Sequence, residues 1–130
     1  MNSPRWISRE ECEALHEMMV SKFGGLLGVR DDHLLESALA KPQNQHAYGS
    51  PSLMDLAASY ASGIVKNHPF LDGNKRTGFM MAAGFIELNG YRFEASEADA
   101  VIRTLALAAS EMTESAYAAW LEANSHPVLT

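Results

Sequence analysis

The sequence predicts an all-α protein, a compact bundle of helices that forms a single domain over residues 1–130. Three observations favour this fold class. Sequences that cap helix N-termini recur along the chain, apolar residues between them recur every three or four positions, and the alternating pattern of β-strands is nearly absent. With 47% apolar residues, a chain of this length can also bury a core of its own.

The first helix is expected to begin after Ser8 and to end at Gly24-Gly25. Ser8 and Glu11 have the spacing of a capping box, in which the serine accepts a backbone N–H and the glutamate reaches back to the cap. Apolar side chains then recur at helical spacing: Cys12, Leu15, Met18, Met19 and Phe23.

A shorter second helix is expected to begin at Asp31 or Asp32 and to end at Pro42, because proline cannot donate the N–H that a helix interior uses. Residues 42–52 are then expected to form a polar, turn-rich loop. A loop of this length inside a compact domain is usually functional or mobile.

The same signals bound the remaining elements. They are a third helix from Ser52 to Asn67, a fourth from about Asn74 to Asn89, an extended link at residues 91–93, and two helices capped by Ser96 and Thr113. The fourth helix has almost no polar side after its first turn, and this composition predicts a central, buried helix.

Composition and charge exclude several classes of protein. The net charge of −6 argues against a nucleic-acid-binding protein and against one held electrostatically at a membrane surface. No run approaches the roughly eighteen apolar residues of a membrane span, and the N-terminus has no apolar signal segment. The single cysteine, Cys12, excludes an internal disulfide and is typical of a reducing compartment. We therefore expect a cytoplasmic protein.

The segment His68-Pro-Phe-Leu-Asp-Gly-Asn-Lys-Arg76 gathers the polar chemistry of the chain on the loop before the fourth helix. A helix N-terminus offers unpaired N–H groups and partial positive charge, and so binds phosphate readily. Gly73 lets the backbone approach a ligand closely, while Lys75 and Arg76 add positive charge. The segment therefore contains the parts of an anion-binding site.

The same segment also carries a candidate base and a candidate metal ligand. His68 titrates near neutrality and can accept a proton from an attacking hydroxyl. Asp72 offers the hard oxygen atoms that Mg²⁺ prefers alongside substrate phosphates. These residues are the components of a phosphoryl or nucleotidyl transfer site. From the residues alone, an ordinary helix cap with solvated charges remains the competing interpretation.

His68–Arg76 resembles the signature of the Fic/Doc family, H-x-F-x-[DE]-[GA]-N-[GK]-R, at every specified position. The likeness extends to residues 24–42, to Asn67 and to Asn89-Gly-Tyr91, and it covers about Ile7 to Trp120. Over this range the chain is similar to the small Doc ("death on curing") branch of the family. The resemblance implies a Fic-type bundle with the motif loop at the N-terminus of a central buried helix, ATP or another nucleoside triphosphate as co-substrate, and Mg²⁺.

Carried over residue by residue, the resemblance implies that His68 is the catalytic base and Asp72 the metal ligand. Gly73 and Asn74 would belong to the anion-binding loop, and Arg76 would pair with phosphate. It also implies that the segment 42–52 is a flap on which the target protein docks as an added strand.

Lys75 distinguishes two reactions within the family. The resemblance implies a second glycine at this position in members that transfer an adenylyl group. It implies lysine in Doc-like toxins, which transfer the γ-phosphate to a Ser/Thr hydroxyl of a protein. The expected target protein is a translation factor such as an elongation factor. Gly73 departs from the alanine of the Doc form and keeps adenylyl transfer open as an alternative. A metal-dependent phosphohydrolase is a further alternative, and a catalytically silent partner-binding module is disfavoured because every catalytic position is filled.

A protein antitoxin is the second expected partner. Fic-type enzymes that inhibit themselves carry a helix of the form [ST]-x-x-x-E-[GN], and the nearest string here, Ser110 to Ser115, lacks the final Gly or Asn. Inhibition is therefore expected from a separate chain.

Other reactive or polar residues have simpler interpretations. Cys12 is expected in the core, His46 is expected to be solvated, and Arg30 is expected to form a structural ion pair or a cap. Tyr117 and Trp120 are compatible with either a core or a partner surface.

Overall fold

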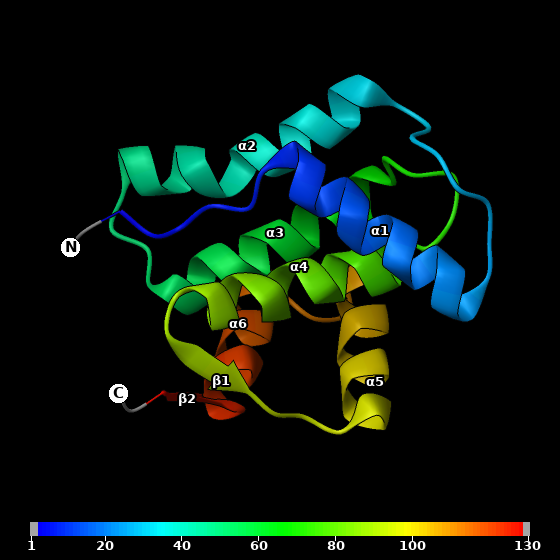
Figure 1. The fold of residues 1–130 in the computed structure, drawn as a ribbon. Coiled ribbons are helices and arrows are strands. Elements are labelled where there is room, and N and C mark those ends of the chain that lie inside the picture. Colours follow the sequence, from blue (N-terminus) through cyan, green and yellow to red (C-terminus); the bar gives the residue numbers. More distant parts are fainter. Residues whose placement is uncertain (1–2, 129–130) are drawn as a thin grey trace.

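The computed structural model describes residues 3–128, which contain six helices and a two-stranded antiparallel sheet (Figure 1). The predicted all-α class is confirmed. The elements are α1 (Arg9–Phe23), α2 (Asp32–Tyr48), α3 (Leu53–Asn67), α4 (Asn74–Leu88), β1 (Tyr91–Phe93), α5 (Glu97–Ala108), α6 (Glu114–Ala123) and β2 (Ser125–Pro127). The four predicted caps each accept a backbone N–H from three positions on: Ser8, Ser52, Ser96 and Thr113.

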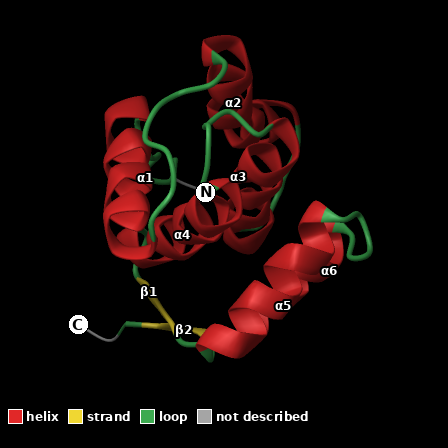
Figure 2. Ribbon diagram, turned by 90° about the vertical axis from the view of Figure 1, so that its right-hand side faces the viewer, coloured by secondary structure: helices red, strands yellow, loops and turns green. Residues whose placement is uncertain are grey.

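Helices α3 and α4 lie side by side at the centre, with α2 on one side and α5 and α6 on the other (Figures 1 and 2). Eleven of the fifteen residues of α3 are buried, against seven of fifteen in α4. The burial of α4 is therefore more one-sided than its apolar composition suggests, because Phe79 and Met80 are only half-buried and Leu88 is exposed. α3 is the more buried of the two, and α2, α4, α5 and α6 pack against it.

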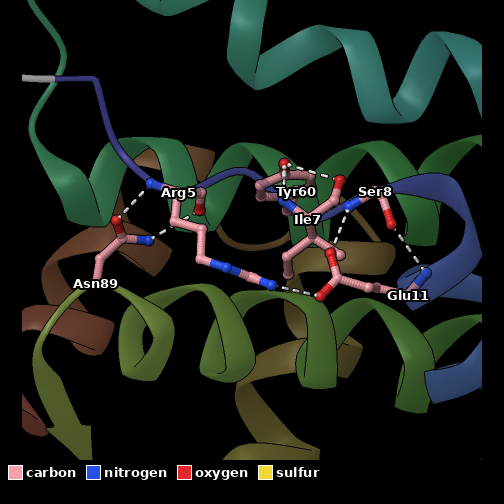
Figure 3. A network of polar contacts seen from close by, with 6 residues as sticks. All are labelled: Arg5, Ile7, Ser8, Glu11, Tyr60 and Asn89. Carbon is pink, nitrogen blue, oxygen red and sulfur yellow. Dashed lines mark hydrogen bonds and ion pairs between the residues drawn. The ribbon is translucent and has the colours of Figure 1, made fainter.

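The segment before α1 ties three helices together (Figure 3). The N–H of Arg5 donates to Oδ1 of Asn89 at the end of α4 (2.7 Å), and Nδ2 of Asn89 donates back to the carbonyl of Arg5 (3.1 Å). The N–H of Ile7 donates to the hydroxyl of Tyr60 in α3 (3.0 Å). Ser8 and Glu11 then complete the predicted capping box of α1. These bonds fix the direction in which α1 runs toward the motif loop.

The prediction that Pro42 ends the second helix is wrong. α2 continues to Tyr48 with a buried Pro42 inside it. The proline leaves the carbonyl of Ala38 without its helical N–H partner, at a cost of about 3 kcal/mol in an ordinary helix interior. Here Ala38 lies against Gly63 of α3, where a Cβ would stand only 3.1 Å from its carbonyl oxygen. Close packing of α2 on α3 and burial of the proline ring offset the loss.

The predicted flap at residues 42–52 is consequently wrong as well. Residues 43–48 belong to α2, and only the stretch 49–52 connects it to α3. His46, expected to be solvated, is half-buried and meets the ring of Trp6 edge-on, with centroids 5.5 Å apart. The continuing helix places this side chain against the N-terminal segment instead of solvent.

The last two helices close the remaining side of the core. Tyr117 and Trp120, left open by the sequence, are core residues at 0% and 7% exposure. Nε1 of Trp120 donates to Oδ2 of Asp99 in α5 (2.7 Å), which joins the two helices. Between residues 3 and 128, none of the helices has both the length and the apolar character needed to span a membrane.

Candidate active site

The candidate site is built on the loop between α3 and α4. Its first residue, His68, follows the last turn of α3 in the left-handed region (φ 50°, ψ 55°), and its side chain is exposed. A non-glycine residue in this region carries a conformational cost of about 1 kcal/mol or more. Such a conformation persists only when surrounding contacts hold it.

Arg30 supplies those contacts. Its Nε donates to the carbonyl of His68 (2.7 Å) and its Nη2 to the carbonyl of Asn67 (3.0 Å). Its backbone N–H donates to the carbonyl of Pro69 (2.6 Å). The carbonyls of Asn67 and His68 are among those that the end of α3 leaves without helical partners. The expected cap role of Arg30 is confirmed, and the cap fixes the direction of the His68 side chain.

Asn74 closes the loop on itself. Its Oδ1 accepts from the N–H of Phe70 (3.0 Å), and its Nδ2 donates to the carbonyl of the same residue (3.0 Å). Asn74 is 8% exposed, and both polar atoms of its side chain form hydrogen bonds. Asn74 can therefore contribute to anion binding only through its backbone N–H, in the first turn of α4.

Phe70 and His16 form the floor of the loop. The two rings are stacked, with centroids 3.9 Å apart and planes at 8°. Nε2 of His16 lies 2.8 Å from the carbonyl oxygen of Asp72, and since a carbonyl can only accept, His16 donates. His16 is 2% exposed. α1 thus holds both ends of the turn that presents the Asp72 carboxylate.

The Asp72 carboxylate is exposed, and one of its oxygens is engaged. Oδ2 accepts from the N–H of Leu26 (2.8 Å) in the segment between α1 and α2. Among residues 3–128 there is no group of three His, Cys, Asp or Glu side chains that could enclose a metal ion. A single available carboxylate fits Mg²⁺, which is held in nucleotide sites by one or two carboxylates together with substrate phosphates.

The N-terminus of α4 carries the anion-binding features. Gly73 is its N-cap at φ 74°, and it supplies no side-chain oxygen to the first N–H groups of the helix. Lys75 and Arg76 are exposed, and in the described part of the chain neither has a carboxylate within ion-pair distance. The helix end therefore presents unpaired N–H groups and two free cations together, which is the arrangement that binds phosphate.

Arg76 is held by an aromatic ring. Its Cζ lies 4.4 Å from the centroid of Phe23, and Nζ of Lys22 lies 5.4 Å from the same ring. A cation over an aromatic face is attracted by the ring quadrupole, and the guanidinium keeps its N–H groups for a ligand. Three cations thus gather at this end of a chain whose net charge is −6.

Comparison with known proteins decides the family. The model of the Fic/DOC family matches residues 6–86, which is more than half of the chain. The chain belongs to the Fic/Doc family. The matched region contains α1 to α3, the motif loop and most of α4, so it includes every Fic/Doc motif residue described above.

The chain is also similar in sequence to two relatives. The chain is 43% identical over 76 residues to "Toxin Doc" of Mycolicibacterium smegmatis, an alignment that covers 56% of the chain and 58% of that protein. It is 37% identical over 87 residues to "Protein kinase doc" of Escherichia phage P1, covering 66% of the chain and 69% of that protein. The chain therefore spans less than two thirds of the length of the first relative.

Two residues of this Fic/Doc site were not found by sequence reasoning. His16 was not considered, and Phe23 was assigned only to the apolar face of the first helix. His16 contacts Asp72 and Phe23 contacts Arg76, in each case more than fifty positions away in sequence, so no local pattern could reveal them. A histidine on the apolar face of α1 was the one available signal, because a buried histidine needs a hydrogen-bond partner.

Proposed function

We propose that the chain is a single Fic-type domain that acts as a Doc-like toxin, transferring the γ-phosphate of a nucleoside triphosphate to a Ser/Thr hydroxyl of a protein. The observation that carries the proposal is the N-terminal end of α4. There a glycine cap, Lys75 and Arg76 leave an open phosphate site, one short loop away from the exposed side chain of His68. The names of the two relatives, a toxin and a protein kinase, agree with it.

In this mechanism, His68 takes the proton of the target hydroxyl as its oxygen forms a bond to the γ-phosphorus. The bond between that phosphorus and the bridging oxygen breaks, and the nucleoside diphosphate leaves. Lys75, Arg76 and the N–H groups of α4 offset the negative charge of the leaving phosphates. Mg²⁺ held by Asp72 would add further positive charge to the phosphate oxygens.

The proposal is tested by replacing the base. His68→Ala should lower phosphate transfer by about a hundredfold or more, as for loss of a general base. The fold should be unchanged because the side chain is exposed. His33→Ala is the matched control, since this exposed histidine lies in the first turn of α2 and its side chain forms no hydrogen bond or ion pair with the described residues of the loop. Near-normal transfer by His68→Ala would remove His68 from the chemistry.

Adenylyl transfer is the second candidate, and Gly73 is the residue that favours it, since the Doc form of the motif has alanine at this position. ATP labelled at the α or at the γ phosphate distinguishes the two reactions on a translation extract. We expect the γ label on the target protein and not the α label. Lys75→Gly should weaken γ transfer by freeing space at the helix end and removing a cation. Transfer of the α label by the unmutated protein would instead assign adenylyl transfer.

We also propose that the natural partners in the cytoplasm are a translation factor as target and an antitoxin as inhibitor. The glutamate of the candidate inhibitory string, Glu114, is bound to Lys41 and Gln45 of α2. Burial raises the pKa of its carboxyl, but hydrogen bonds from Lys41, Gln45 and Ser62 outweigh this effect and hold the pKa below its usual value. Glu114 therefore serves to join α6 to α2, which supports inhibition by a separate chain.

A further inference from the structure

The middle of α1 contains a buried histidine, His16. All five histidines of the chain lie within residues 3–128, and His16 is the only one that is buried, at 2% exposure. Burying an imidazole costs free energy unless its polar atoms are hydrogen-bonded, and an aliphatic side chain would pack α1 onto the core without that cost. The hydrogen bond that His16 makes is therefore the feature that distinguishes it from an ordinary core residue.

This hydrogen bond holds one peptide group of the motif loop. Nε2 of His16 donates to the carbonyl oxygen of Asp72 (2.8 Å), and stacking on Phe70 keeps the plane of the imidazole ring fixed. The carboxylate of the same aspartate accepts from the N–H of Leu26 (2.8 Å). Asp72 is thus held through its side chain and through its carbonyl, so the peptide group between Asp72 and Gly73 cannot turn freely.

The fixed carbonyl sets the direction of the N–H of Gly73. The peptide bond between Asp72 and Gly73 is trans, so its C=O and N–H point in opposite directions. With the carbonyl turned toward the buried His16, the N–H points away from that ring. Within residues 3–128 the N–H of Gly73 makes no hydrogen bond, and Gly73 is only half-buried, so a ligand can reach it.

The conformation of the next residues directs further N–H groups to the same place. Gly73 is left-handed (φ 74°, ψ 18°), and Asn74 is the first residue of the right-handed helix α4. Consecutive residues of opposite handedness bring successive N–H groups together in a concave nest that binds anions. A reversed peptide group would replace the first of these N–H groups by a carbonyl oxygen, which repels phosphate.

We propose that His16 is a positioning residue of the phosphate site, because its bond to the carbonyl of Asp72 keeps the N–H of Gly73 directed at a phosphate oxygen. His16 itself does not touch the ligand. The inference rests on the phosphate site of the proposed function and deepens it by naming the buried group that orients one of its donors. It is the same for γ-phosphate and for adenylyl transfer.

Substitutions of His16 separate its hydrogen bond from its packing. His16→Gln keeps an N–H donor at about the same distance from the backbone but loses the stacked ring, whereas His16→Phe keeps a ring and loses the donor. His16→Leu is a second variant without the donor. Cys12→Ala is the matched control, since this residue is fully buried one helical turn earlier in α1. Thermal melts show at which temperature each variant is folded.

The direct measurement observes the peptide group itself. The sequence contains a single Asp-Gly pair, Asp72-Gly73. Protein labelled with ¹³C at the aspartate carbonyls and with ¹⁵N in glycine therefore gives one signal in an HNCO spectrum, from the peptide group that His16 binds. Inorganic tripolyphosphate, added without Mg²⁺, should shift the N–H of this signal downfield in the unmutated protein and in His16→Gln. The shift should be lost in His16→Phe and in His16→Leu.

Titration calorimetry with tripolyphosphate gives the matching affinities. His16→Phe and His16→Leu should bind about tenfold more weakly, as for loss of one hydrogen bond to a charged group. His16→Gln and Cys12→Ala should bind like the unmutated protein. Equal weakening in His16→Gln or in Cys12→Ala would mean that His16 only packs α1 against the core, and this result overturns the inference. Unchanged affinity in both variants without the donor also overturns it.

The outcome can be separated from that of the proposed function. An unmutated protein that transfers the γ label from ATP, but whose Asp72-Gly73 signal does not move with tripolyphosphate, rejects the role of His16 and leaves the proposed function standing. An unmutated protein that transfers no label, but shows the expected shifts and their loss in His16→Phe, rejects the proposed function and supports the role of His16 in phosphate binding.

Discussion

At the scale of single residues, the site depends on strain that neighbouring groups hold in place. His68 adopts a left-handed conformation at the end of α3, and the fork of Arg30 binds the two carbonyls on either side of its backbone N–H. The same arginine satisfies the end of a helix and orients the candidate base. A lysine could not make both bonds, because it lacks the planar arrangement of donors.

Asp72 is the residue at which structural and catalytic roles can be separated. In Asp72→Asn, the side-chain oxygen can still accept from the N–H of Leu26, so the loop should keep its conformation. The anionic ligand is lost, and Mg²⁺-dependent ATP affinity should therefore fall by about tenfold or more. Titration calorimetry with and without Mg²⁺ measures this.

Without Mg²⁺, Asp72→Asn and the unmutated protein should bind ATP with similar affinity. If the two proteins also bind equally in the presence of Mg²⁺, Asp72 does not hold the ion. A thermal melt serves as the structural control, since loss of the Leu26 contact would lower the melting temperature of the variant.

The sequence predicted the motif residues of the candidate site and the cap role of Arg30, but not the other contacts that hold the loop. The motif residues could be predicted because they are contiguous and their spacing is itself the signal. The partner of Arg30 lies 38 positions away in sequence and that of His16 lies 56 positions away. Asn74 was predicted only as a member of the anion-binding loop, and the bonds of its side chain to the backbone of Phe70 were not foreseen. Such contacts follow from how helices pack, which no local pattern contains.

At the scale of helices, capping chemistry was a better guide to boundaries than proline. Ser8, Ser52, Ser96 and Thr113 each begin a helix where expected, because a cap is a local bond between a side chain and a nearby N–H. Pro42 failed as an end signal because its cost is local while the compensation, packing against α3, is not. The error moved a predicted docking loop into a helix.

The contact between α3 and α4 gives a sharp test at this scale. A Cβ at Gly78 would lie 2.7 Å from a methyl group of Val65 and 3.1 Å from the carbonyl oxygen of Ala61. Gly78→Ala should therefore force the two helices apart and lower the free energy of unfolding by about 1–3 kcal/mol. Urea denaturation followed by circular dichroism measures the change.

Gly84, on the same helix, is the matched control. A Cβ there meets nothing within 4 Å. Gly84→Ala should raise the free energy of unfolding by about 0.5–1 kcal/mol, because alanine loses less conformational entropy in a helix than glycine. Equal effects of the two substitutions would show that α3 and α4 are not in the close contact described.

At the scale of the whole molecule, charge is distributed unevenly. The chain carries a net charge of −6, yet Lys22, Lys75 and Arg76 lie together at one end of α4. The overall acidity keeps nonspecific anions away from most of the surface, while this local group attracts phosphate. The sequence predicted the acidic net charge and the two cations of the motif, but only the fold brings Lys22, at the end of α1, beside the start of α4.

Cys12, the single cysteine, reports on the stability of the whole molecule. It is fully buried in α1, and burial raises the pKa of its thiol to about 12. The thiolate is the nucleophile that attacks a thiol reagent, and both burial and the raised pKa suppress it, so the native protein should react at least about a thousandfold more slowly than the protein in denaturant. Mass spectrometry of the protein during labelling measures the rate, and the ratio of the two rates gives a free energy of opening.

Gly78→Ala decides whether that opening is global. The nearest atoms to a Cβ at Gly78 belong to α3 and not to α1, so local fraying of α1 would expose Cys12 at a similar rate in both proteins. If Cys12 becomes accessible only when the whole core opens, the variant should react faster by the factor that its loss of stability in urea predicts. We expect the second result, because Cys12 belongs to the same continuous core as α3 and α4. An unchanged labelling rate in a destabilised variant would mean that α1, with His16 and Phe23, detaches from the phosphate site independently of the core.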